Sequence, residues 1–148
     1  MPSESTLGIY IHVPFCVRKC PYCDFYSVPQ TAERMEQYGT ALCRFLRQMQ
    51  TDLPVDTIYF GGGTPSLLPV SLLEEILQTI DKTVSLQQPE ITLECNPATV
   101  DRKTLQQFQG IGINRLSIGV QSLSDVQLKR LGRLHDAKTA IETVEQAA

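Results

Sequence analysis

Hydrophobic and polar positions follow two different periods along this chain, and their alternation predicts strands separated by helices. Residues 7–13 have the period of a strand, with Ile9, Ile11 and Val13 on one face and Tyr10 and His12 on the other. Three further apolar segments predict strands at 57–60, 90–94 and 115–120. Helical periodicity predicts helices at 31–50, 69–84, 101–109 and 124–130, and another from 136 onward.

This order of elements predicts an α/β fold with parallel strands, built of about four βα units. Residues that can carry chemistry follow the strands: a group of cysteines after the first, three glycines at 61–63 after the second, Glu94 at the third and Gln121 after the fourth. In barrel-like α/β folds the carboxyl ends of the strands meet at one face. We therefore expect one shared site built from several loops.

The domain organisation follows from the same pattern. No linker or low-complexity segment interrupts the chain, and the helix from residue 136 reaches the last residue without a stop signal. A sheet that ends after its fourth parallel strand leaves a long edge exposed. We therefore expect residues 1–148 to form one core domain that is incomplete at its C-terminus.

Composition narrows the class of protein. The 148 residues are 42% hydrophobic and 20% charged, as in ordinary globular domains. The net charge of −3 gives no general attraction to nucleic acid, so no nucleic-acid partner is expected. No apolar run approaches the roughly 20 residues of a transmembrane segment. The polar N-terminus MPSESTLG carries no targeting signature, and we expect a cytoplasmic location with reduced cysteines.

Three of the five cysteines, Cys16, Cys20 and Cys23, lie together in the segment HVPFCVRKCPYCDF. Three thiolates on one loop can bind three irons of a [4Fe-4S] cluster and leave the fourth iron open for chemistry. A structural zinc site, which prefers four ligands in paired knuckles, and unligated reduced cysteines are the alternatives. The odd number of cysteines and the absence of a signal peptide argue against a disulfide framework.

The other cysteines and the histidines have less specific roles. Cys43 lies with Phe45 on the apolar stripe of the first helix, so we expect it to be buried. Cys95 should point from its strand toward the helix layer. His12 fits a satisfied core histidine as well as a functional one, and His135 would either cap the next helix or face solvent.

Several motifs resemble those of a known superfamily. The spacing Cys-x3-Cys-x2-Cys after the first strand, with Tyr22 before the third cysteine, and GGGTP after the second strand resemble the radical S-adenosylmethionine superfamily. The stretches YIHVPFC, IYFGGGTPSLL, ITLECNP and RLSIGVQSLSDVQLKRLGR are similar to its branch of oxygen-independent coproporphyrinogen III oxidases and related heme chaperones. The resemblance implies the N-terminal part of a partial (β/α)6 barrel.

The same resemblance implies the cofactors and their ligands. The cluster cysteines would be Cys16, Cys20 and Cys23, and S-adenosyl-L-methionine, reductively cleaved by the cluster, would contact Tyr10, Tyr22, Gly63, Thr64, Glu94, Gln121 and Arg133. Gly63 would let the backbone approach the methionine end of the cofactor, where a side chain would block it. Glu94 would accept hydrogen bonds from the ribose or amino group. The fork of Arg133 suits the methionine carboxylate, with Arg130 as the neighbouring alternative.

One short stretch bears on function. The oxidases of this branch carry a fourth cysteine two residues after the third, whereas Cys23 is followed here by Asp24 and Phe25. This difference favours a heme chaperone that delivers heme to respiratory heme proteins. The alternatives are a coproporphyrinogen III oxidase in porphyrin biosynthesis and an iron–sulfur electron-transfer protein. The expected partners are heme or a porphyrinogen, target heme proteins and an electron donor.

Overall fold

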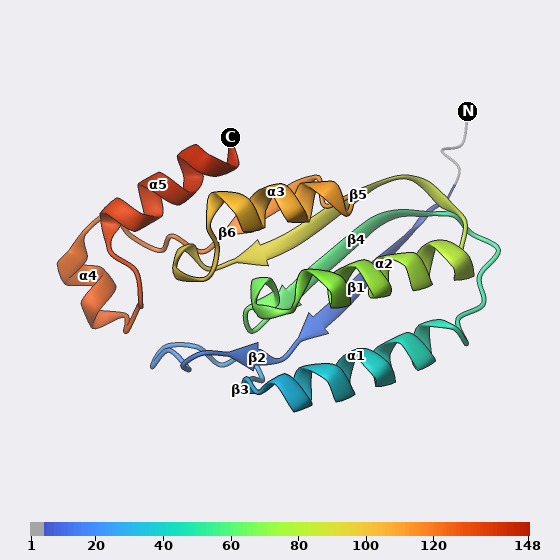
Figure 1. The fold of residues 1–148 in the computed structure, drawn as a ribbon, viewed down its shortest axis with the longest axis horizontal. Helices are drawn as coiled ribbons and strands as arrows, with labels where there is room; N and C mark the ends of the chain where they lie inside the picture. The colour runs from blue at the N-terminus through green and yellow to red at the C-terminus, as the bar shows by residue number, and fades with distance from the viewer. Residues whose placement is uncertain (1–4) are drawn as a thin grey trace.

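A parallel sheet forms the centre of the computed structural model, which describes residues 5–148 (Figure 1). Its strands are β1 (Leu7–Val13), β4 (Val55–Gly62), β5 (Leu86–Cys95) and β6 (Arg115–Ile118). They lie in the order β1-β4-β5-β6, and every neighbouring pair is parallel. The predicted α/β class with parallel strands is confirmed.

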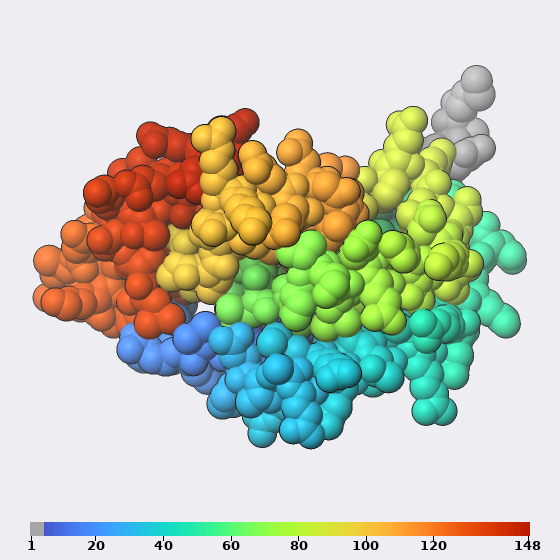
Figure 2. All heavy atoms as spheres, viewed as in Figure 1, coloured from blue at the N-terminus to red at the C-terminus, as the bar shows by residue number. Residues whose placement is uncertain are grey.

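Helices cover one face of this sheet. In Figure 1, α2 (Val70–Thr83) and α3 (Arg102–Gly110) lie in front of the strands and α1 (Ala32–Leu46) lies at the bottom of the view, below β1, and Figure 2 shows the same segments side by side. The helices α4 (Asp125–Arg130) and α5 (Ala137–Ala147) follow β6. The short elements are β2 (Phe15–Cys16), its partner β3 (Val28–Pro29), and the 3-10 turns η1 (Pro65–Leu67) and η2 (Pro97–Thr99).

Alternation along the strands separates the core from the opposite face of the sheet. Ile58, Phe60 and Leu93 are fully buried in the core cluster that also includes the apolar residues of α2. Burying each such side chain contributes about 1.5–3 kcal/mol, which holds the helices against this face. Because successive strand residues point to opposite faces, Tyr59 and Glu94 lie on the side that α1–α3 leave uncovered.

Side-chain caps fix three helix starts close to the predicted ones. Thr31, Asp101 and Asp136 each accept a hydrogen bond from the backbone N–H three residues later, at 3.2, 2.8 and 2.8 Å. Each therefore satisfies a backbone donor that the first turn leaves unpaired. The helices α1, α3 and α5 begin at the residue after each cap.

Other boundaries differ from the sequence prediction. The strand predicted at 57–60 extends over Val55–Gly62, because its outer residues, glycines included, still pair with β1 or β5. The helix predicted to reach residue 50 ends at Leu46. Phe45 was assigned to the apolar stripe of that helix but is 66% exposed, because it lies beyond the edge of the stripe that packs on the sheet.

None of the helices in the described chain combines the length and the apolar character that crossing a membrane requires. The polar N-terminal segment, to which the prediction of no targeting signal refers, lies partly outside the described residues.

Candidate functional site

A cavity of about 260 Å³ opens at the carboxyl ends of the strands, where the topology brings four loops together. Nine of the ten residues predicted from the sequence line it, and only Tyr10 does not. They are Cys16, Cys20, Tyr22 and Cys23 from the first loop, Gly63 and Thr64 after β4, Glu94 in β5, and Gln121 and Arg133 after β6.

The three cysteines of the first loop are free and half-buried. Thr64 donates from its hydroxyl to Cys16 Sγ at 3.8 Å, and Arg133 Nη1 donates to Cys20 Sγ at 3.7 Å. Hydrogen bonds to the sulfurs are a recurrent feature of iron–sulfur sites, where they tune the reduction potential. The donor groups around this loop therefore fit thiolate ligands.

Within residues 5–148, no three Cys, His, Asp or Glu side chains are arranged to hold a single metal ion. Each thiolate of a cubane cluster binds a different iron, so its cysteines need not converge on one point. Thiols that do not converge on one point are compatible with such a cluster.

The remaining two cysteines are buried, as expected for Cys43, and Cys95 also lines the cavity. Cys43 is 0% exposed and Cys95 is 4% exposed. Burial raises the pKa of Cys95 to about 12, and the nearby charge of Glu94 acts in the same direction. Cys95 is therefore a neutral thiol at neutral pH in the metal-free protein.

Glu94 is held by two protein donors. The hydroxyl of Tyr59 donates to Oε1 at 2.8 Å, and the backbone N–H of Gly62 donates to Oε2 at 3.1 Å. An ionised carboxylate has about four acceptor positions, so further positions remain for a ligand in the cavity. Sequence reasoning missed Tyr59, although its place between the buried Ile58 and Phe60 could have assigned its hydroxyl to the site face.

Positions 61 and 62 need glycine because aromatic rings from the strands pack against the backbone there. A Cβ on Gly61 would lie 2.9 Å from the ring of Tyr59 and 3.0 Å from the ring of Tyr10. Gly62 has φ +112°, and a Cβ there would lie 2.6 Å from the ring of His12. These two glycines thus let rings from β1 and β4 lie directly on the backbone.

Position 63 needs glycine because the backbone at the start of the cysteine loop lies directly against it. A Cβ on Gly63 would lie 2.6 Å from the carbonyl oxygen of Phe15. Its N–H donates to Val13 O at 2.8 Å, and the N–H of Thr64 donates to Phe15 O at 2.7 Å. The sequence argument assigned this glycine to the approach of a cofactor, whereas the observed close contact is with protein backbone.

Tyr10 lies on the uncovered face of the sheet rather than in the lining of the cavity. Its side chain is 58% exposed, and its ring stacks on Tyr59 with centroids 5.9 Å apart and an interplanar angle of 23°. Desolvation, and then the charge of Glu94, raises the pKa of Tyr10. It is therefore a neutral hydroxyl next to the cavity at neutral pH.

Arg133 connects the end of β6 with the cysteine loop. Its Nη2 donates to Gly119 O at 2.9 Å, and its Nη1 donates to the Tyr22 hydroxyl at 3.3 Å as well as to Cys20. Its Nε is buried without a hydrogen-bond partner. Such an orphaned donor points to an acceptor that the protein itself does not supply. The alternative residue Arg130 is exposed on α4 and does not line the cavity.

Gln121 lies where the chain leaves β6 and has φ +68°. A residue other than glycine in this left-handed region is strained by about 1–3 kcal/mol, and such strain is concentrated at functional sites. The conformation places Gln121 in the wall of the cavity.

His135 neither caps a helix nor faces solvent, contrary to the sequence prediction. It is 6% exposed, and Asp136 caps α5 in its place. Its Nδ1 lies 3.2 Å from Asn96 Oδ1, and its Nε2 lies 3.0 Å from Val120 O. His135 thus connects the loop after β5 with the loop after β6. Asn96, which the sequence places with Glu94 at the end of its strand, also lines the cavity.

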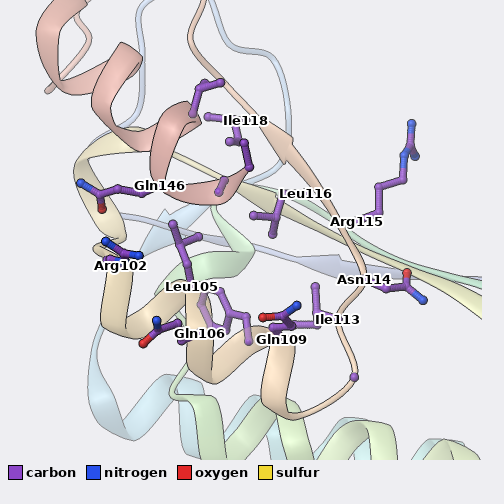
Figure 3. A pocket seen from close by; sticks show the side chains of 15 residues that line it. Arg102, Leu105, Gln106, Gln109, Ile113, Asn114, Arg115, Leu116, Ile118 and Gln146 are labelled. Atoms are coloured by element: carbon purple, nitrogen blue, oxygen red, sulfur yellow. The ribbon is translucent and has the colours of Figure 1, made fainter.

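A larger hollow of about 730 Å³ lies elsewhere, between α3, β6 and α5 (Figure 3). Leu105, Leu116 and Ile118 line it together with polar residues that include Arg102 and Gln146. Its lining contains no cysteine, histidine or carboxylate side chain and none of the predicted site residues. The smaller cavity is therefore the candidate site, because the groups capable of chemistry surround it.

The fold and the loop-built cavity are those of a barrel-type α/β protein, and the family follows from comparison with known proteins. The model of the radical SAM superfamily matches residues 10–148. The chain therefore belongs to this superfamily. Membership implies a [4Fe-4S] cluster and S-adenosylmethionine as cofactors.

Two similar curated proteins are named heme chaperone HemW. The chain is 39% identical to the one from Haemophilus influenzae, over 99% of this chain and 41% of that protein. It is 40% identical to the one from Escherichia coli, over 96% of this chain and 39% of that protein. A bovine protein named radical S-adenosyl methionine domain-containing protein 1, mitochondrial, is 33% identical over 99% of this chain and 34% of its own length. The chain thus spans about two fifths of the bacterial relatives.

Among solved structures, the coproporphyrinogen III oxidase HemN from Escherichia coli, described as a radical SAM enzyme, has a TM-score of 0.88. The match covers 97% of this chain and 34% of that one at 24% sequence identity. At this level of identity the likeness establishes a shared fold and no more.

Proposed function

We propose that the candidate site binds a [4Fe-4S] cluster through Cys16, Cys20 and Cys23, with S-adenosyl-L-methionine beside it. The observation that carries this proposal is the meeting of three free thiols and the unpartnered, buried Nε of Arg133 at one cavity. Soft thiolates suit iron–sulfur clusters, and a guanidinium suits a carboxylate. When bound, the two groups supply one-electron reductive cleavage of a carbon–sulfur bond, and the protein orients them and excludes water.

Two charged residues bind different groups of the cofactor. Arg133 binds the methionine carboxylate, since its guanidinium has donor capacity that the protein leaves unused. Glu94 accepts hydrogen bonds from the amino group or the ribose, since Tyr59 and Gly62 fix its carboxylate at the cavity.

The neutral residues complete the pocket. Gly63 and Thr64, whose N–H groups donate to Val13 O and Phe15 O, would face the methionine end through their remaining atoms, and Gln121 offers both a donor and an acceptor. Tyr22 would contact the adenine, and Tyr10, which stacks on Tyr59 outside the cavity lining, would contact the cofactor from the uncovered face of the sheet.

For the whole protein we propose a heme chaperone that passes heme to respiratory heme proteins and receives electrons from a donor protein. Two relatives at about 40% identity carry that name. Phe25, which lines the cavity, stands where the oxidases of the sequence resemblance have a fourth cysteine. A coproporphyrinogen III oxidase is the competing function.

Parallel assays on anaerobically reconstituted protein test the proposal. One titrates heme against the protein, and the other measures conversion of coproporphyrinogen III in the presence of a reductant and S-adenosylmethionine. Tight heme binding without conversion is the expected result. Turnover to protoporphyrinogen IX would replace the chaperone assignment by the oxidase, and failure to bind heme would overturn it as well.

A further inference from the structure

His12 connects the glycines after β4 with the cysteine loop. Its Nε2 lies 3.1 Å from the carbonyl oxygen of Tyr26, and its Nδ1 lies 3.4 Å from the hydroxyl of Tyr10. A carbonyl oxygen only accepts, so Nε2 carries the proton and Nδ1 accepts from the hydroxyl. The imidazole therefore donates one hydrogen bond to the far end of the loop.

Contacts with two neighbouring elements hold the ring and the backbone of His12 in place. A Cβ on Gly62 would lie 2.6 Å from Cε1 and 2.7 Å from Nδ1, so the ring rests on the backbone of β4. The backbone carbonyl of His12 accepts a hydrogen bond of 2.8 Å from the hydroxyl of Tyr38 in α1. The side chain is thus a rigid support whose free end is Nε2.

The cysteine loop has few hydrogen bonds between its own residues. Between residues 17 and 27, one backbone hydrogen bond joins two members of the loop, from Cys23 N to Cys20 O at 3.1 Å. On its other side, Arg18 donates to Gly132 O at 2.6 Å, and Arg133 reaches Cys20 and Tyr22. The bond to Tyr26 therefore ties the loop to β1, opposite the ties to the segment after α4.

We propose that His12 is a positioning residue that holds the cysteine loop over the carboxyl end of the sheet, through its Nε2–H bond to Tyr26 O. The consequence for cluster assembly rests on the proposed function, since it requires the loop to carry the cluster ligands. A loop ordered in advance loses less conformational entropy when three thiolates bind one cluster. The same role explains why the ring must lie on a glycine.

Limited proteolysis of the metal-free full chain under reducing conditions tests the loop directly. Lys19 is exposed in the loop and gives trypsin a cleavage site beside Cys20. His12→Leu keeps the bulk of the ring and removes the donor, so cleavage after Lys19 should become roughly five-fold faster, as expected for loss of one hydrogen bond. His12→Gln retains an N–H at similar reach and should restore the wild-type rate. Tyr10→Phe removes only the partner of Nδ1 and should leave the rate unchanged.

The outcomes separate a loop support from general packing. Equal cleavage rates in His12→Leu and wild type would overturn the proposal, and so would equal acceleration in His12→Leu and His12→Gln. Acceleration that merely follows a drop in the thermal midpoint would also overturn it. Cluster loading is measured on the same proteins: a wild-type chain that takes up no cluster would refute the proposed function, while the proteolysis would still decide the role of His12.

Discussion

Tyr59 and Glu94 are joined across β4 and β5 by a hydrogen bond of 2.8 Å from the phenol to Oε1. Burial, and then the bond to the carboxylate, raises the pKa of Tyr59, so it remains a donor at neutral pH. With Gly62 N–H on Oε2, the carboxylate is oriented by protein groups alone. Glu94 is therefore preorganised for any ligand that the cavity receives.

Tyr59→Phe should weaken binding of S-adenosylmethionine without disturbing the fold. The phenyl ring can still stack under Tyr10, but Glu94 loses one of its two donors and becomes free to rotate. A lost hydrogen bond to a charged group is worth about 1.5–3 kcal/mol, of which only part is transmitted to a ligand, so we expect about five- to tenfold weaker binding. Isothermal titration calorimetry of the reconstituted protein with S-adenosylmethionine measures this affinity.

Tyr38→Phe is the matched control for that variant. It also removes the hydroxyl of a half-buried tyrosine. In the wild type, however, the hydroxyl of Tyr38 donates to His12 O and not to Glu94. Unchanged affinity in Tyr59→Phe, or an equal loss in both variants, would show that the orientation of Glu94 does not govern cofactor binding.

Cys20→Ala should abolish the charge-transfer absorbance of the reconstituted cluster, because only two thiolates would remain for the irons. Cys43→Ala should retain it, since Cys43 is 0% exposed within the helix-covered core. Visible spectra and iron content after anaerobic reconstitution measure both. A full cluster in Cys20→Ala, or its loss in a folded Cys43→Ala protein, would contradict the ligand assignment.

The glycines allow a comparison of two chemically identical changes. Gly63→Ala forces a Cβ to within 2.6 Å of Phe15 O, and the backbone must shift. We expect it to destabilise the fold by about 1–3 kcal/mol, as overpacking does. Gly110→Ala meets no atom within 4 Å at the end of α3 and should stabilise by up to about 1 kcal/mol. Urea denaturation of both variants measures the difference. Equal effects would mean that the contact with Phe15 carries no strain.

The gathering of the site residues could be predicted because it depends on topology. Parallel strands bring their carboxyl ends to one edge, so motifs that each follow a strand must meet there. The contacts that require glycine at positions 61 and 62 could not be predicted in the same way. The alternation in β1 placed Tyr10 and His12 on one face, but which backbone they would contact depends on the pairing of His12 with Gly61 and Val13 with Gly62.

Tyr59 and His135 were missed or misassigned for related reasons. The hydroxyl of Tyr59 acquires its role only when β5 places Glu94 beside it. His135 lies in a polar stretch between two helices, which is typical of a solvated loop. Its burial arises from contacts with Asn96 and Val120, which belong to two other loops.

Buried His135 should make the stability of the protein depend on pH. Desolvation lowers its pKa below the ordinary value of 6.5, and the positive charge of Arg133 acts in the same direction, against the bond to Val120 O and the negative charge of Asp136. Between the folded-state pKa and 6.5, the unfolded chain binds more protons than the folded chain, so the free energy of unfolding rises with pH. The stability contributed by neutral His135 is thus fully present above pH about 6.5 and is lost as the pH falls toward the folded-state pKa, with a slope of at most about 1.4 kcal/mol per pH unit.

His135→Asn isolates this contribution, because asparagine retains hydrogen-bonding groups but does not titrate. The variant should be less stable than wild type at pH 7.5, since it fills less of the space between the two loops. The difference should shrink as the pH is lowered to 5.5, because only the wild type loses stability from this group. Urea denaturation at several pH values gives both curves, and the carboxylates, which titrate lower, affect them equally. Parallel curves over this range would mean that His135 is not held in its neutral form by the fold.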